Sequence, residues 1–301
     1  MRVTNRTLLN NYLANLNRNL RRMSKYQDQL SSGKEIRRPS DDPFGATRSM
    51  ALHTSLNQNK QYLRNIEDSL GWVDITDSAL GNMGDIMNRL RELVIKGANG
   101  SLSDSDRNAI KDEVVQLIEQ MAQIGNANYD GRYIFGGQRT TKPPFHVDHT
   151  NGYLIEYSGD HHMLKREISP NVVIEVNIPG EWIKGGKDGS LDLPNTLSSI
   201  VAALESGDSS QLGGILLEEL DANIDSLLSL RSEAGAKYNR LESAKMKNEE
   251  ESFNMTDLLS KTEDIDFAEK IMHYMMMENI YYASLATGAK IMQPSLLDFL
   301  K

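Results

Sequence analysis

Between residues 9 and 30, apolar side chains recur in alternating steps of four and three positions. This spacing has the 3.5-residue period of a coiled-coil stripe, so it predicts a helix that lies along another helix. The stripe consists of Leu9, Leu13, Leu16, Leu20, Met23, Gln27 and Leu30.

The C-terminal region repeats this pattern in alternating steps of three and four. Its stripe consists of Ile265, Ala268, Met272, Met275, Asn279, Tyr282, Ala286 and Ala289. Residues 272–277 are rich in methionine, whose unbranched side chain suits contact with non-identical neighbours, although ordinary helix packing is the simpler interpretation. We expect the two ends of the chain to pair with each other or with the ends of other copies.

Residues 31–46 interrupt the first helix, because two prolines and two glycines remove backbone donors and helical dihedrals. We expect a joint between two regions here, formed by Gly33, Pro39, Asp41, Asp42, Pro43 and Gly45. The adjacent carboxylates of Asp41 and Asp42 could suggest a catalytic pair. Beside prolines and arginines, helix caps or local ion pairs account for them better.

Three further stripes in the middle of the chain are typical of a helical bundle. They are Leu56, Leu63, Ile66, Leu70, Val73, Asp77, Leu80, Gly84, Met87, Arg91 and Val94; then Ile110, Val114, Leu117, Met121 and Ile124; then Leu217, Leu220, Ile224, Leu227, Arg231, Ala234, Tyr238 and Leu241. Residues 103–106 offer side-chain acceptors that predict the start of the second of these helices. A shorter helix is expected at 197–204.

From residue 143 to residue 183 the period changes to two. Tyr153, Ile155 and Tyr157 follow an Asn-Gly turn, which predicts a hairpin with Phe145 and Val147 on the opposing strand. Another strand is expected at 172–178.

These patterns predict a mainly α fold, a long coiled-coil-like bundle formed by both chain ends with a small inserted β-rich domain. We expect five segments: a terminal coiled-coil segment and joint (1–45), the N-terminal half of a helical rod (46–140), the β-rich domain (141–190), the C-terminal half of the rod (191–260) and a second terminal segment (261–301). Only 39% of residues are hydrophobic and 6% aromatic, which favours extended helical packing over one large globular core.

The charge is unevenly distributed along the chain. Residues 1–38 carry nine basic and two acidic side chains, whereas residues 242–269 carry nine acidic and three basic ones. Opposite charges on segments with matching stripes support side-by-side pairing, with two solvated helix faces as the alternative. The formal net charge of −9 argues against a general nucleic-acid binder.

Other functional classes lack their motifs. The chain has no cysteine, and His146, His149 and residues 160–162 fit a solvated hairpin loop better than a metal site. We find neither a phosphate-binding glycine loop nor a nucleophile elbow, so we expect no cofactor and no enzyme activity. No apolar run approaches the length of a membrane span or of a secretory signal, so we expect no membrane insertion.

Both ends of the chain resemble the flagellin superfamily. The first stripe followed by residues 30–33 and 41–45 is similar to the amino-terminal signature of that superfamily, and Arg231, Gly235 and residues 239–242 are similar to its carboxy-terminal half. Residues 1–5, 129–137 and 295–300 are closer to the members that join the flagellar hook to the filament than to filament flagellin. Residues 141–190 match no motif.

The resemblance implies a structural component of the bacterial flagellum that is exported through the flagellum's own secretion channel without a cleaved signal. It implies a ring of copies between the first hook-associated protein and flagellin, with a cytoplasmic chaperone at the C-terminal region before export. Filament flagellin is the nearer alternative, and a coiled-coil scaffold is a more remote one.

We expect the terminal segments, about 1–35 and 265–301, to be largely disordered in the free monomer, because a single partner helix offers little apolar burial against the entropy of ordering. They would become paired helices once several subunits surround them. The expected assembly interface comprises Leu9, Leu13, Leu16, Leu20, Met23, Leu30, Met272, Met275, Tyr282, Ala286, Ala289, Leu296, Leu297 and Leu300.

Overall fold

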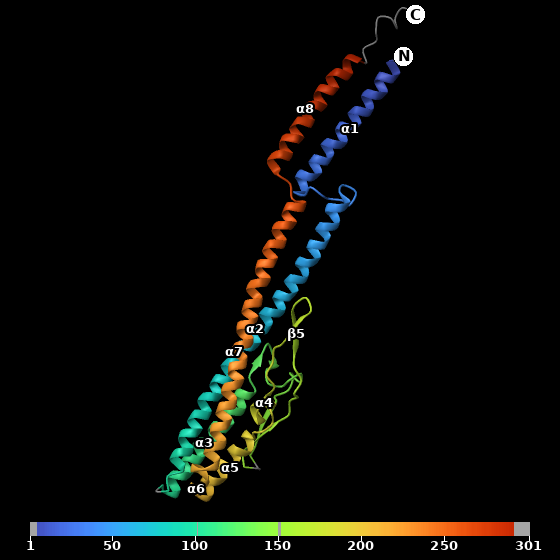
Figure 1. Ribbon diagram of the computed structural model, residues 1–301. Coiled ribbons are helices and arrows are strands. Elements are labelled where there is room, and N and C mark those ends of the chain that lie inside the picture. Colours follow the sequence, from blue (N-terminus) through green and yellow to red (C-terminus); the bar gives the residue numbers. More distant parts are fainter. Residues whose placement is uncertain (1–4, 101, 150–151, 292–301) are drawn as a thin grey trace, which may run out of the picture. The chain divides into compact units, whose positions relative to one another are not determined.

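The structure is a computed structural model that describes residues 5–100, 102–149 and 152–291. Its helices are α1 (Asn5–Ser32), α2 (Pro43–Gly97), α3 (Asp104–Gly125), α4 (Gly180–Gly185), α5 (Leu193–Ser206), α6 (Ser209–Gly213), α7 (Ile215–Glu263) and α8 (Phe267–Ile291) (Figure 1). Its strands are β1 (Asn128–Tyr129), β2 (Arg132–Tyr133), β3 (Phe145–Asp148), β4 (Leu154–Tyr157), β5 (Lys165–Ser169) and β6 (Val172–Glu175). The predicted fold class, mainly α with a small β-containing middle region, is confirmed.

The chain divides into two compact units. The middle unit comprises residues 59–250, and the end unit lies within residues 1–58 and 251–301. Both boundaries fall inside long helices, α2 and α7. The five predicted segments therefore remain a prediction about domain organisation, and the two units are described separately below.

In the middle unit, the predicted stripes of α2 and α7 form the core at every seventh position. The buried residues of α2 at this spacing are Ile66, Val73, Leu80, Met87 and Val94, and those of α7 are Leu220, Leu227, Ala234 and Leu241. They share one apolar cluster with α3 and α5. The seven-residue repeat is thus confirmed as the packing rule of this bundle.

The polar members of those stripes lie beside the core and link the two long helices. Arg231 Nε of α7 donates to Asp77 Oδ1 of α2 over 3.1 Å, and Arg91 Nε of α2 donates to Asp221 Oδ1 of α7 over 2.6 Å. Buried Asn59 and Asn248 also bond to each other, with Asn248 Nδ2 donating to Asn59 Oδ1 over 2.7 Å. A buried amide pair fixes the register of two helices, because any shift leaves its polar groups unpaired.

The strands form two-stranded antiparallel hairpins within the described residues. The two strands of the predicted hairpin are confirmed, and in them Phe145 pairs with Tyr157 and Val147 with Ile155. The Tyr157 hydroxyl lies 2.9 Å from the carbonyl oxygens of Phe135 and Asp160, and burial raises its pKa to about 12. Phe145 and Ile155 belong to the same apolar cluster as the helices, so the β region shares the core of the bundle.

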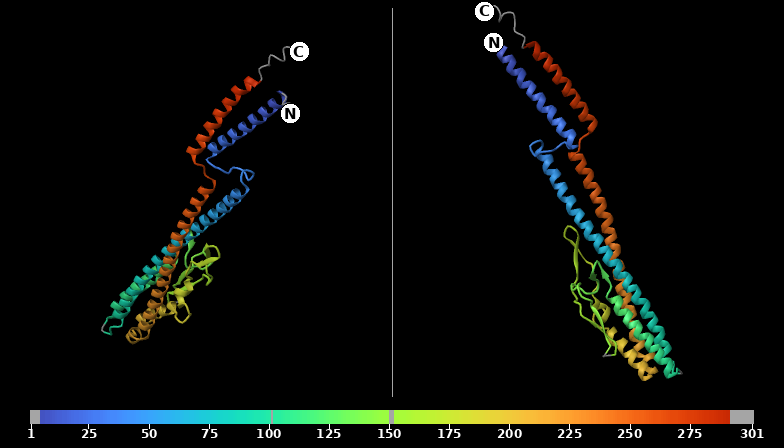
Figure 2. Two further views of the ribbon diagram at one scale, coloured as in Figure 1. Left: turned by 45° about the horizontal axis from the view of Figure 1, so that its top comes forward. Right: turned by 180° about the vertical axis from the view of Figure 1, so that it is seen from behind.

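In the end unit, α1 and α8 lie side by side and antiparallel, as Figures 1 and 2 show from each direction. Tyr12 of α1 packs against Gly288 of α8, where a Cβ atom would come within 2.3 Å of the tyrosine ring. Near the other end of the pair, the rings of Tyr26 and His273 stack with centroids 5.7 Å apart. The absence of a side chain at Gly288 therefore allows the two helices to approach closely.

Candidate assembly surface

The contact between α1 and α8 covers one narrow stripe of each helix. On α1 the buried or half-buried positions are Leu9, Tyr12, Leu16, Asn19, Met23, Tyr26 and Leu30, which follow a heptad spacing, together with Leu20 and Gln29. On α8 they are Lys270, His273, Tyr274, Met277, Glu278, Tyr281, Ser284 and Gly288. Both sets include polar and aromatic residues, and most of their side chains are only half-buried, unlike those of the middle bundle.

The predicted stripe of α1 coincides with the contact at every seventh residue and at Leu20. Leu9, Leu16, Met23 and Leu30 are half-buried, as is Leu20, whereas Leu13 is 44% exposed. Tyr12, Asn19 and Tyr26 take the alternating positions that the sequence assigned to Leu13, Leu20 and Gln27. The apolar edge of α1 therefore faces partly toward solvent.

Within one chain the predicted stripe of α8 does not face α1, so its contact with other copies is the expectation that stays a prediction. Met272, Met275 and Tyr282 are 61%, 58% and 61% exposed, whereas Met277 is only 9% exposed and faces α1. Ala286 and Ala289 are also exposed. The reason is that α8 is apolar on nearly every side, so more than one heptad phase fits its sequence. Leu296, Leu297 and Leu300 lie outside the described residues.

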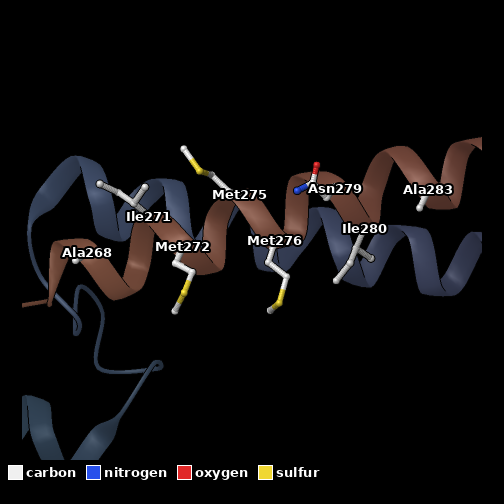
Figure 3. Close-up of a pocket in the computed structure, with 8 residues that line it drawn as sticks. All are labelled: Ala268, Ile271, Met272, Met275, Met276, Asn279, Ile280 and Ala283. Carbon is white, nitrogen blue, oxygen red and sulfur yellow. The ribbon is translucent and has the colours of Figure 1, made fainter.

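The exposed side of α8 forms a continuous apolar surface. Its lining residues all come from this one helix and are Ala268, Ile271, Met272, Met275, Met276, Asn279, Ile280 and Ala283. Figure 3 shows Met272 and Met276 projecting from the α8 ribbon on the same side as Ile280. An exposed apolar surface of this kind usually marks an interaction site. We call it the α8 outer face.

The joint residues end one helix and begin the next. Gly33 adopts a left-handed conformation (φ 70°), and its N–H donates to Gln29 O over 2.8 Å, which closes α1. Asp42 caps α2 by accepting from Phe44 N over 3.1 Å, and Pro43 is the first residue of that helix.

The remaining joint residues complete the turn between the helices. Asp41 accepts a hydrogen bond from Arg38 N over 3.1 Å, in a turn that includes exposed Pro39. Gly45 is buried against Ile36. The two carboxylates of Asp41 and Asp42 thus bond to backbone amides, which is the role of caps.

A buried carboxylate holds the two connections of the end unit together. Glu263, the last residue of α7, accepts hydrogen bonds from Lys34 Nζ and from Ser49 Oγ of α2, the latter over 2.6 Å. His53 Nε2 lies 3.3 Å from the same carboxylate. The side chain of Glu263 is 9% exposed. We call these four residues the Glu263 cluster.

Backbone bonds and a second ion pair reinforce the Glu263 cluster. Glu35 N donates to Glu263 O over 2.6 Å, and Ile265 N donates to Gly33 O over 3.2 Å. Asp264 Oδ1 lies 2.6 Å from Lys34 Nζ. The connection after α1 is therefore bonded to the connection before α8. Sequence analysis missed Ser49 and His53, for which the only signal was the opposite charge of the two segments that meet here.

The charges of the Glu263 cluster stabilise one another. Burial raises the pKa of Glu263, but hydrogen bonds from Lys34 and Ser49 and the charge of Lys34 outweigh it, so the net pKa is lowered. Hydrogen bonds to Asp264 and Glu263 raise the pKa of Lys34. A lowered carboxylate pKa stabilises the fold at neutral pH, and this contribution is lost as the pH falls through the pKa of the folded state.

The other candidate sites are not assembled. His161 and His162 stack with ring centroids 4.5 Å apart, and across the described ranges no three His, Asp or Glu side chains gather closely enough to hold a metal ion. Within those same ranges, no helix combines the length and apolarity needed to cross a membrane.

The geometry defines a helical assembly subunit, with a well-packed middle bundle and an end pair whose apolar side is uncovered. Comparison with known proteins agrees. Residues 3–140 match the model of the bacterial flagellin N-terminal helical region. Flagellar hook-associated protein 3 of Escherichia coli K12 is 27% identical over 286 residues, covering 86% of this chain and 87% of that protein.

Two further relatives have similar coverage. Flagellin of Bacillus subtilis is 27% identical over 299 residues, covering 97% of each chain. The crystal structure of the flagellar junction protein FlgL from Legionella pneumophila has a TM-score of 0.59 at 15% identity and covers 73% of this chain and all of that one. The chain is therefore similar to hook-associated protein 3 and to flagellin over most of its length. Both sequence relatives are named as flagellar proteins.

We predict that Glu263→Gln lowers the free energy of unfolding by about 1–3 kcal/mol at pH 7, because it removes charge-assisted hydrogen bonds. The difference between the two proteins should shrink as the pH falls through the lowered pKa of Glu263, since the carboxylate of the parent chain is then protonated. Urea denaturation of the full-length chain at each pH measures this. The matched control is Asp257→Asn, which removes an exposed pair with Lys261 and should cost less than about 0.5 kcal/mol. Equal losses for both variants at pH 7 would contradict the role of the Glu263 cluster.

Proposed function

We propose that this chain joins the flagellar hook to the filament by packing its terminal helices against those of neighbouring subunits. The observation that carries the proposal is the α8 outer face, whose apolar side chains are left uncovered in a single chain. The relative named hook-associated protein 3 supports the junction position rather than the filament. Flagellin remains the alternative, because a flagellin is similar over the same length.

The expected interface residues now fall into two groups. Leu9, Leu16, Met23 and Leu30 take part in the pairing of α1 with α8 inside one chain. Met272, Met275, Tyr282, Ala286 and Ala289 are exposed on α8 and are available to other copies. Methionine can adapt to differently shaped neighbours, which suits a subunit that contacts more than one kind of protein.

The partners follow from a position at the junction. Copies of the chain would form a ring, with the first hook-associated protein on one side and flagellin on the other. Before assembly, the apolar side of α8 needs a cover, which is the physical reason for a cytoplasmic chaperone at the C-terminal region. The chain would reach the junction by export through the flagellar secretion channel, without a cleaved signal.

Deleting the gene tests the junction role. We expect the mutant to build hooks that carry no filament and to release flagellin into the medium, because filament subunits lose the surface on which they assemble. Electron microscopy of the cells and immunoblotting of the medium measure both outcomes. Normal filaments in the mutant would contradict the junction role, and complete hooks with short filament stubs would favour the flagellin alternative.

Replacing two residues of the α8 outer face tests the mechanism. Burying a methionine stabilises a contact by about 1.5–3 kcal/mol, so Met272→Ser with Met275→Ser should lower incorporation into flagella at least about tenfold. Met272→Leu with Met275→Leu keeps the apolar surface and should assemble normally. Incorporation is measured by quantitative immunoblotting of purified flagella.

Both methionines are exposed in the single chain, so the circular dichroism of these variants should be unchanged. Full incorporation of the serine variant would rule out the α8 outer face as an assembly surface.

A further inference from the structure

Most charges of the acid-rich segment find partners inside the chain. Glu263 and Asp264 bind Lys34, and Asp257 lies 2.7 Å from Lys261. Asp266 caps α8 by accepting from Ala268 N over 2.9 Å. Within one chain this segment does not lie along the basic N-terminal helix, since α8 is the helix that pairs with α1.

Three acids of the segment remain exposed on one face of α7. Glu242, Glu249 and Glu250 have no ion-pair or hydrogen-bond partner among the described residues. Their spacing, with exposed Met246 between them, is i, i+4, i+7 and i+8, which places all four on one side of a helix. The nearby Lys245 does not neutralise them, because its Nζ lies 3.1 Å from Glu67 of α2. We call this set the acidic stripe.

A basic set of the same length lies on α1. Arg18, Arg21, Arg22 and Lys25 are all exposed and are spaced so that they share one helix face. None of them has an ion-pair partner within the described chain. The one acid of α1, Asp28, binds Arg37 at 3.1 Å. We call this set the basic stripe.

The neighbouring helix does not balance the basic stripe. Along α8, the acids Glu269 and Glu278 are matched in number by Lys270 and Lys290, and Glu269 lies 3.3 Å from His273. Like charges at i, i+3 and i+4 repel one another and destabilise an isolated helix. The basic stripe of α1 is therefore left with an unmatched charge that a partner can relieve.

We propose that the basic stripe of one copy binds the acidic stripe of α7 in a neighbouring copy. This inference rests on the proposed function, because it requires copies to lie next to one another. The basic stripe extends about 10 Å and the acidic stripe about 12 Å at 1.5 Å per residue, so their lengths match. Complementary charge steers an incoming subunit and selects its register, and Met246 gives the acidic stripe an apolar centre.

Cross-linking between copies tests the contact directly, since the natural chain contains no cysteine. One chain carries Ala14→Cys, at an exposed position in line with the basic stripe, and a second carries Met246→Cys. When the two chains are incorporated together into flagella and oxidised, we expect a disulfide-linked dimer on a non-reducing gel. The matched control pairs Ala14→Cys with Asn82→Cys, an exposed position on α2, and should give no dimer. Absence of the first dimer would overturn the proposal.

Charge exchange tests whether opposite charge is what holds the two stripes together. Arg21→Glu with Arg22→Glu, or Glu249→Lys with Glu250→Lys, should each lower incorporation into flagella about fivefold or more, because exposed pairs contribute modestly and add up along an interface. A chain carrying all four changes restores opposite charges and should recover incorporation. Failure to recover would overturn the proposal and would point to a different acidic partner for α1.

The serine variant of the α8 outer face keeps the two proposals distinguishable. If that variant fails to assemble while the charge variants assemble normally, packing through α8 is supported and the charge contact is contradicted. If the serine variant assembles normally while charge exchange lowers incorporation and the chain with all four changes recovers it, packing through α8 is contradicted and the charge contact is supported.

Discussion

Within one chain, α1 and α8 can bury only a small part of their surface against each other, and the rest of the structure depends on this constraint. Two antiparallel helices bury a single stripe on each helix, and here Asn19, Lys270 and Gly288 interrupt the large apolar residues of that stripe. In the middle unit, α2 and α7 have further partners in α3 and α5, and their seventh positions are fully enclosed. The same heptad rule therefore gives a self-sufficient bundle in one unit and an incomplete pair in the other.

The Glu263 cluster gives the incomplete pair a defined starting point. A carboxylate that is nearly buried must keep its partners, because removing one leaves an uncompensated charge. Lys34 comes from the connection after α1, Ser49 and His53 come from α2, and Glu263 ends α7. The cluster thus holds one end of the helix pair in place. At the far end, the two helices are in contact through Tyr12 and Gly288.

The sequence predicts the buried side of a helix well only where apolar and polar residues lie on clearly different faces. Val73 and Leu80 lie in a helix whose other faces are polar, so the buried side of α2 was predictable. The pairing of β3 with β4 was predictable from their alternating side chains, but its register was not, since a two-residue Asn-Gly turn would place Val147 opposite Glu156 instead of Ile155. In α8 the alternatives Met275 and Met277 are equally apolar, so nothing in the local pattern decides which one faces α1. That choice depends on tertiary contacts such as the stacking of Tyr26 on His273.

The sequence also predicts polar contacts only in part. The sequence indicates that acids and bases from the two ends attract one another, and Lys34 does bind Glu263. It does not indicate that Ser49 completes the site or that Arg18 and Lys25 stay exposed, since those outcomes depend on which helices become neighbours. Long-range charge composition predicts attraction between segments, but only packing selects the individual pairs.

Amide hydrogen exchange of the full-length chain, measured residue by residue in the dilute monomer and in the assembled state, tests the central claim most directly. In the monomer we expect α1 and α8 to exchange far faster than the amides around Leu80 and Leu90, with some slowing toward Lys34. In the assembled state both helices should become protected. Protection of α1 and α8 in the monomer equal to that of the α2 core would contradict the claim that other copies complete their packing.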